Sequence, residues 1–306
     1  MKDMRQEFAD TLLEVGMKDN KFIVLVGDIS HFKLVQFAKA CPGRYYNVGI
    51  CEPTIVNMAA GLSMVGFHPV VHTIAPFIVE RSYEQIKLDF CYQNVGGNII
   101  TVGSAFDYST LGCTHHCYVD FALLKPLPNT QIVFPASPVE LNVLFKQSYD
   151  NGRLNYFRVP KYSHEQVFEP DQLKVGKGIM VREGSSVTIV VTGPQLKTAL
   201  RSVVELKAIN IDPEIIYIHT IKPFDQKIVL ESVNKTKRVL VIEEHSMYGG
   251  MGDEVMRATK GISGIKYAFI SLKDDFIRDY GTYEELCDLL GFSVKGIVSK
   301  IRSELI

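Results

Sequence analysis

The sequence predicts an α/β protein of two domains, each a mainly parallel sheet flanked by helices. A chain of 306 residues usually forms two domains, each large enough to bury its own core. Strand-like apolar runs alternate with helix-periodic segments from end to end, an order typical of parallel sheets. The stretch 161–184 is polar and irregular, which suits a connection between domains. We therefore expect a first domain over 1–160 and a second over 185–306.

In the first domain, short apolar runs bounded by turn residues predict strands at Phe22–Val26, Tyr45–Val48, Pro69–Ile74, Asn98–Val102 and Gln131–Phe134. Segments with helical spacing of apolar residues predict helices at Arg5–Val15, Glu52–Val65 and Val79–Cys91. A further helix is expected to begin after Ser137, because Ser stands at the N-cap, Pro at N1 and Glu140 at N3.

In the second domain the same patterns alternate. Strands are predicted at Ser186–Val191, Glu214–His219, Arg238–Glu243 and Tyr267–Leu272. Helices are predicted at Pro194–Leu206, Asp225–Val233, Gly249–Thr259, Tyr283–Leu290 and Val294–Leu305.

Composition excludes several function classes. The formal net charge is -1 and the basic residues are scattered, which argues against a nucleic-acid groove or an anionic membrane surface. Apolar runs all stay below the roughly 18 residues that a membrane span needs. The charged N-terminus has no signal-peptide pattern, and the 6 cysteines follow no secreted-type spacing. We therefore expect a cytoplasmic location with reduced thiols.

Glu52 is the most informative single residue. It stands where a predicted strand gives way to a predicted helix, in Asn47-Val-Gly-Ile-Cys-Glu-Pro53. Ligand sites of α/β sheets gather at the carboxyl ends of strands, so this position favours a functional role. Position alone also allows a simpler reading, in which the carboxylate only stabilises the first helical turn by about 0.3–1 kcal/mol.

Neighbouring motifs carry a family resemblance. Gly49-Ile-Cys-Glu52, Met58-Ala-Ala-Gly-Leu62 and Pro69-Val-Val-His-Thr73 resemble the pyrimidine-binding domain shared by transketolase, deoxyxylulose-phosphate synthase and the beta subunit of 2-oxoacid dehydrogenases. The resemblance implies thiamine diphosphate as cofactor, with Glu52 bonded to N1′ of its aminopyrimidine. A proton shared there favours the imino tautomer, which can deprotonate the thiazolium carbon. Glu52 is thus expected to be catalytic as well as cofactor-binding.

Phe77-Ile-Val-Glu-Arg81-Ser-Tyr83-Glu-Gln85 is similar to the family segment whose aromatic residue stacks on the aminopyrimidine. The resemblance makes Phe77, Arg81 and Tyr83 cofactor-binding candidates, although aromatic residues in such a segment are commonly plain core. Val26-Gly-Asp-Ile-Ser30 resembles a transketolase segment near the thiazolium ring, which adds Asp28.

Gly112-Cys-Thr-His-His116 resembles the family motif whose histidine faces the substrate carbonyl and hydroxyls, so His115 is expected to be catalytic and substrate-binding. A rival reading takes Cys113, His115, His116 and Cys117 as metal ligands, but their spacing is too tight for the usual zinc patterns. Transketolases carry an acid where Leu111 stands, which leaves the sugar open.

Tyr156-Phe-Arg-Val-Pro160 resembles the family segment whose arginine holds the substrate phosphate, which implies this role for Arg158. In the second half, Ile221-Lys-Pro-Phe-Asp225 and Val241-Ile-Glu-Glu-His-Ser-Met-Tyr-Gly-Gly250 resemble the C-terminal domain of the same enzymes. Full-length transketolases also have a diphosphate-binding domain, whose Gly-Asp-Gly segment and metal-binding Asn have no match here.

The resemblance therefore implies the C-terminal subunit of a split transketolase. A partner subunit would supply the diphosphate cradle and the Mg²⁺ or Ca²⁺ ion, in a heterotetramer of two plus two, with sugar phosphates as substrates and ketol transfer as the reaction. Alternatives are a carboligase similar to deoxyxylulose-phosphate synthase, a 2-oxoacid dehydrogenase beta subunit, or a non-catalytic assembly paralogue.

Overall fold

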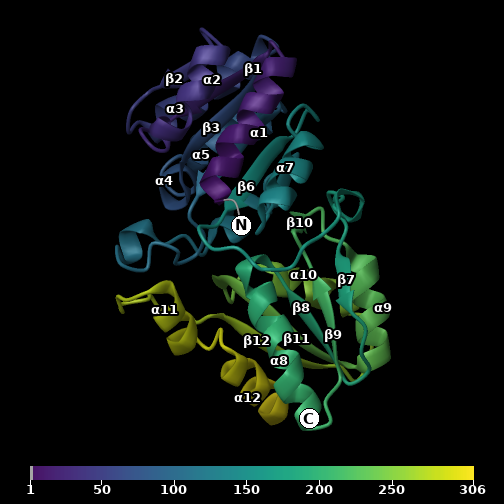
Figure 1. The fold of residues 1–306 in the computed structure, drawn as a ribbon. Coiled ribbons are helices and arrows are strands. Elements are labelled where there is room, and N and C mark those ends of the chain that lie inside the picture. Colours follow the sequence, from purple (N-terminus) through teal and green to yellow (C-terminus); the bar gives the residue numbers. More distant parts are fainter. Residues whose placement is uncertain (1–2) are drawn as a thin grey trace.

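The computed structural model describes residues 3–306, and they form two mainly parallel sheets flanked by helices, one sheet in each half (Figure 1). The first sheet has the strand order β10-β5-β6-β4-β3-β1-β2. Its members are β1 Phe22–Val26, β2 Tyr45–Asn47, β3 His68–Ile74, β4 Gly97–Val102, β5 Thr130–Val133, β6 Leu154–Val159 and β10 Thr220–Lys222. All neighbouring pairs are parallel except β10 with β5. The predicted α/β class is confirmed.

The helices of the first half are α1 Met4–Lys18, α2 Val35–Ala40, α3 Glu52–Met64, α4 Ala75–Val79, α5 Tyr83–Gln85, α6 Asp120–Leu124 and α7 Pro138–Lys146. Shorter turns are η1 His31–Lys33 and η3 Cys113–His115. Ser137 caps α7 by accepting a hydrogen bond from the Glu140 amide, as its pattern predicts. The single helix predicted over Val79–Cys91 is wrong: α4 ends at Val79, and α5 runs on into a π-helical stretch, η2, over Ile86–Tyr92.

The second sheet has the order β12-β11-β8-β9-β7, with β7 antiparallel to β9. Its strands are β7 Ile179–Arg182, β8 Val187–Val191, β9 Pro213–Tyr217, β11 Arg238–Ser246 and β12 Lys266–Leu272. The helices around it are α8 Leu196–Ala208, α9 Gln226–Thr236, α10 Met251–Thr259, α11 Tyr283–Leu290 and α12 Val294–Glu304, with short turns η4 Pro170–Gln172 and η5 Gly193–Gln195. Strand β7 lies within the stretch expected to be an irregular connection, so that stretch is partly ordered sheet.

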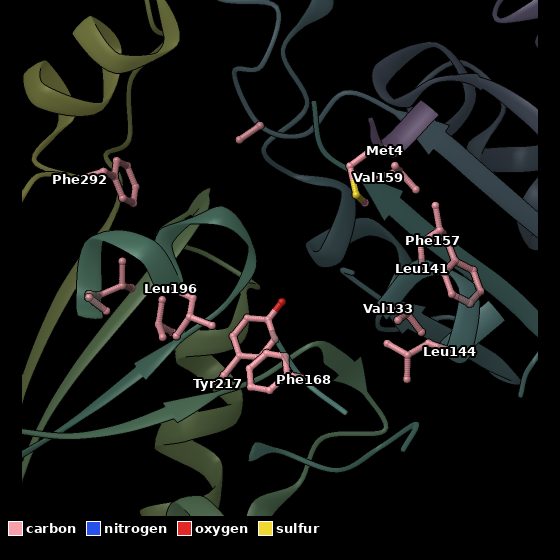
Figure 2. Packing of buried hydrophobic residues seen from close by; sticks show 14 of the residues in the cluster. Met4, Val133, Leu141, Leu144, Phe157, Val159, Phe168, Leu196, Tyr217 and Phe292 are labelled. Atoms are coloured by element: carbon pink, nitrogen blue, oxygen red, sulfur yellow. The ribbon is translucent and has the colours of Figure 1, made fainter. Parts of the chain in front are cut away.

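The two halves share buried contacts at their junction, where Figure 1 shows β10. The Tyr217 hydroxyl donates to Glu140 Oε2 at 2.8 Å, and the Tyr217 ring stacks on Phe168 (Figure 2). His164 Nε2 lies 2.5 Å from Glu140 Oε1. Burial acts to raise the pKa of Glu140, but the charge and hydrogen bond of His164 outweigh it and the pKa lies below its ordinary value. The halves are therefore joined by a buried polar network within a continuous apolar core.

Two further features bear on the sequence expectations. Between residues 3 and 306, no helix is both long enough and apolar enough to cross a membrane. The six cysteines are free thiols, four of them buried.

Candidate functional site

Three of the predicted site residues lie at one edge of the first sheet. Glu52 begins α3 shortly after β2, Phe77 lies on α4 directly after β3, and His115 lies in the segment that follows β4. Strands β2, β3 and β4 run in the same direction, so their carboxyl ends meet at the same edge. This is the edge where α/β folds bind ligands.

Glu52 is buried, with 2% of its surface exposed, and its two polar contacts are long. The Thr73 hydroxyl donates to Oε1 at 3.4 Å, and Arg81 Nη1 lies 3.5 Å from Oε2. A buried carboxylate is costly unless strong donors satisfy it. Glu52 therefore retains acceptor capacity for a closer donor than the chain itself provides.

Arg81 links Glu52 to Phe77. Its guanidinium carbon lies 4.1 Å above the centroid of the Phe77 ring while Nη1 approaches Glu52. The Arg81 side chain is 52% exposed, so solvent screens both contacts and the side chain can turn away at low cost. A flat N–H donor group thus stacks on the aromatic ring and reaches the buried carboxylate at the same time.

His115 completes the cluster. Its ring meets the Phe77 ring edge-on at a centroid distance of 5.2 Å and the Tyr108 ring at 5.7 Å. Nδ1 lies 2.9 Å from the Thr114 hydroxyl, which fixes the orientation of the imidazole. The ring is half-buried, so one side remains open to a ligand.

The rival metal reading receives no support. Within residues 3–306, no group of three or more His, Cys, Asp or Glu side chains is placed to hold a metal ion. Cys113 is exposed, whereas His116 and Cys117 are buried. Burial lowers the pKa of His116 and raises that of Cys117 well above its ordinary value, which keeps both neutral.

Asp28 and Tyr83 lie close to this edge but outside the cluster. Asp28 follows β1 in a left-handed conformation (φ 55°) and is exposed; its carboxylate accepts a 3.0 Å hydrogen bond from Asn47 Nδ2. Tyr83 is half-buried on α5 and packs partly against the core. Their assignment as cofactor-binding residues stays a prediction.

Arg158 lies in a buried environment that its sequence motif does not predict. Its side chain is fully buried, and Nη2 donates to the Cys117 carbonyl at 2.7 Å while Nε lies 3.3 Å from Asp120 Oδ2. Two aromatic rings enclose its guanidinium, those of Phe121 and Phe134. A substrate phosphate has no access to this group in this structure, so the observed geometry does not support the phosphate role, which stays a prediction. In this structure Arg158 links the two halves of the chain, because Nη2 also donates to the Glu244 carbonyl at 3.1 Å.

Two further polar side chains, those of His72 and Arg5, make contacts that the sequence motifs do not indicate. His72, in β3, is fully buried; Nε2 lies 3.0 Å from the Ser30 hydroxyl and Nδ1 2.7 Å from the Ile100 carbonyl. Burial lowers the pKa of His72 to about 4, so it is neutral near pH 7. The available signal was a histidine in the middle of an apolar strand. The hydrogen bond from Arg5 to the Tyr108 hydroxyl (2.8 Å) had no sequence signal.

Comparison with known proteins supports the transketolase resemblance over nearly the whole chain. The family model for the transketolase pyrimidine binding domain matches residues 1–165, and that for the transketolase C-terminal domain matches residues 176–297. A solved structure, described as a split gene transketolase in an inactive beta4 tetramer, superposes with a TM-score of 0.90 at 30% identity, covering 100% of this chain and 99% of that one.

Three relatives match nearly end to end. A putative transketolase C-terminal section from Methanocaldococcus jannaschii is 29% identical over 99% of this chain and 96% of its own length. A 6-deoxy-6-sulfo-D-fructose transketolase subunit from Clostridium sp. is 29% identical, with coverages of 96% and 92%. One of the subunits of an apulose-4-phosphate transketolase from Phocaeicola vulgatus is 30% identical, with coverages of 96% and 94%. The chain belongs to the transketolase family, of which it carries the pyrimidine-binding and C-terminal domains.

Proposed function

We propose that this chain is the C-terminal subunit of a split transketolase, which transfers a two-carbon ketol unit between sugar phosphates with thiamine diphosphate as cofactor. The proposal depends mainly on one observation: a buried Glu52 with spare acceptor capacity faces a flat guanidinium stacked on Phe77. The family membership supports it, as do relatives named as transketolase subunits.

The residues fit an aminopyrimidine. That heterocycle is flat and carries ring nitrogens next to an amino group, so it can stack on Phe77 and bond to Glu52 as the Arg81 guanidinium does in the free chain. The half-exposed Arg81 side chain would turn aside when the ring enters. Arg81, Tyr83 and Asp28 are the other proposed contacts around the cofactor.

Each residue has a distinct proposed role in the chemistry. Thiamine diphosphate supplies a carbon nucleophile when it is bound. Glu52 holds a proton at the pyrimidine ring nitrogen and thereby sets the tautomer of the ring. His115, oriented by Thr114, polarises the substrate carbonyl and moves a proton at its oxygen.

The partner subunit is the remaining element of the proposal. It would carry the diphosphate-binding domain and the Mg²⁺ or Ca²⁺ ion, and two copies of each subunit would form a heterotetramer in the cytoplasm. Within this chain the pyrimidine-binding domain would comprise 1–160 and the C-terminal domain 185–306. Two of the relatives are named after their sugar substrates, and these sugars differ, so the donor sugar of this chain is left open. Leu111 is the position at which to look for the difference in sugar preference.

The test is to purify this chain alone and together with a subunit that carries the diphosphate-binding domain. We expect ketol transfer between a ketose phosphate and an aldose phosphate only from the pair, with thiamine diphosphate and Mg²⁺ present. Transfer by the single chain would contradict the split arrangement. Full-length deoxyxylulose-phosphate synthases also match, though the chain spans only 46% of one of them, so carboligation from pyruvate is the second candidate. Activity of the pair with pyruvate and not with ketoses would favour it.

A further inference from the structure

The His115 segment, which we define as residues 103–119, connects β4 to α6 without forming a strand. Its only regular element is the single turn η3. Catalytic groups need positions held to within a fraction of an ångström, because a shift of about 1 Å costs roughly 100-fold in rate. Several of the groups that hold this segment come from the second domain.

The segment is held first at Ser104. The Ser104 amide donates to Asp107 Oδ2 at 2.8 Å, and its hydroxyl lies 3.1 Å from Asp107 Oδ1 and 3.3 Å from Glu244 Oε2. Glu244, in β11, is itself fixed in the second domain, because Gln195 Nε2 donates to it at 2.8 Å and the Tyr283 hydroxyl donates to the same oxygen. All five side chains are buried or nearly so.

The protonation states of Glu244 and Asp107 allow a chain of hydrogen bonds between the two domains. A serine hydroxyl donates only one hydrogen bond, so it cannot satisfy two ionised carboxylates at once. Burial and the charge of Asp107 raise the pKa of Glu244 to about 7, and burial raises that of Asp107. The other charged group facing Glu244 is Arg158, which acts in the opposite direction. Near pH 7 Glu244 can therefore donate its proton to Ser104, which in turn donates to Asp107.

Aromatic contacts hold the middle of the segment. The Phe106 ring stacks on Tyr283 of α11 at a centroid distance of 5.3 Å. Tyr280, just before α11, covers Gly112: a Cβ added there would lie 2.7 Å from the Tyr280 ring and hydroxyl. Gly112 has φ +76° and opens the motif that contains His115, so the second domain touches the segment three residues before the imidazole.

We propose that Glu244 is a positioning residue for His115: it anchors the Ser104–Asp107 turn, and with Tyr280 over Gly112 it fixes where the imidazole stands. The turn leads directly into Tyr108, whose ring contacts His115 edge-on. The C-terminal domain thus contributes to catalysis without touching cofactor or substrate. This inference depends on the proposed function only where it concerns turnover.

Hydrogen–deuterium exchange on the purified chain tests the anchoring without a partner subunit. Ser104→Ala removes the hydroxyl between Glu244 and Asp107, and Ser202→Ala is the matched control, since Ser202 is buried in α8 and bonds only to the Ala199 carbonyl. We expect amides of residues 105–118 to exchange about 3- to 10-fold faster in Ser104→Ala and unchanged in the control. Unchanged exchange of these amides would overturn the proposal.

Tyr280→Ala provides a second test, because Tyr280 is 69% exposed and its removal should leave the fold intact. Exchange of residues 109–116 should rise, and Tyr280→Phe, which keeps the ring over Gly112, should restore it. In the active pair, Ser104→Ala should lower kcat about 10-fold with little change in KM for thiamine diphosphate. An unaltered kcat beside altered exchange would refute the positioning role, whereas inactivity of the unmodified pair would refute the proposed function alone.

Discussion

Replacing Glu52 by glutamine should separate activity from stability. Glu52 is buried, yet its contacts with Thr73 and Arg81 are 3.4 and 3.5 Å long, and Arg81 is half-exposed. An ion pair of this kind contributes about 0–1 kcal/mol to the free energy of unfolding. The substitution also removes a buried charge whose desolvation opposes folding. We expect the net change in unfolding free energy to lie within about 1 kcal/mol of zero, and turnover to fall by about 10²–10⁴.

Glu140→Gln is the matched control, because Glu140 is a second buried glutamate in the first turn of a helix. Glu140 accepts hydrogen bonds from the Ala136 amide and the Tyr217 hydroxyl, and it pairs with His164. Breaking a buried pair of this kind costs about 3–5 kcal/mol. The control should therefore lose much of its stability.

Urea denaturation of the isolated chain followed by circular dichroism measures the stability, and ketol transfer by the co-purified pair measures the activity. A Glu52→Gln chain that is destabilised as much as Glu140→Gln would show that Glu52 is a structural residue. Full activity of the variant pair would remove Glu52 from the mechanism.

Three other substitutions have defined outcomes. Phe77→Leu should raise the Kd of thiamine diphosphate for the pair about 2- to 10-fold, by loss of stacking, in isothermal titration calorimetry; an unchanged Kd would exclude a stacking role. Glu244 has a folded-state pKa of about 7 against an ordinary value of 4.5, so the native chain loses stability as pH rises from 4.5 through 7. The Glu244→Gln variant lacks this ionisation, so its free energy of unfolding, measured by denaturation, should rise relative to that of the native chain over this range, by at most about 3 kcal/mol. A difference between the two chains that stays constant with pH would contradict this. Gly193→Ala should cost about 2–4 kcal/mol in the same assay, because φ is +67° and the added Cβ would lie 2.3 Å from the Phe134 ring; a cost below about 1 kcal/mol would show that the ring yields.

Local signals in the sequence predict most of this fold. Strand β1 begins and ends at the predicted residues, and so does α11, whose Thr282 caps the helix with Glu285 in a capping box. The short strands β7 and β10 were not predicted. Each is three or four residues long and is formed by pairing with residues far away in the chain, which no local pattern reports.

The candidate site, like the fold, could be predicted only in part from local patterns. The motif around Glu52 predicts its place at the carboxyl edge of the sheet, and Phe77 and His115 come together with it. The sequence does not reveal that Arg158 is enclosed by the rings of Phe121 and Phe134 and bonded to the Glu244 carbonyl, because all three residues lie far from it in the chain. The anchoring of the His115 segment by Glu244 is non-local for the same reason.

Strand β10 limits how this gene can be rearranged. It belongs to the second half of the chain by sequence but forms the edge of the first sheet, where it pairs with β5. Separating the two halves of the chain at any point in 161–184 would leave the β5 edge with unpaired amides and carbonyls, which invites pairing with other chains. Recombination that exchanges one domain of this chain for a homologous one must therefore preserve compatibility at β5 and β10, so the two domains are expected to be inherited together.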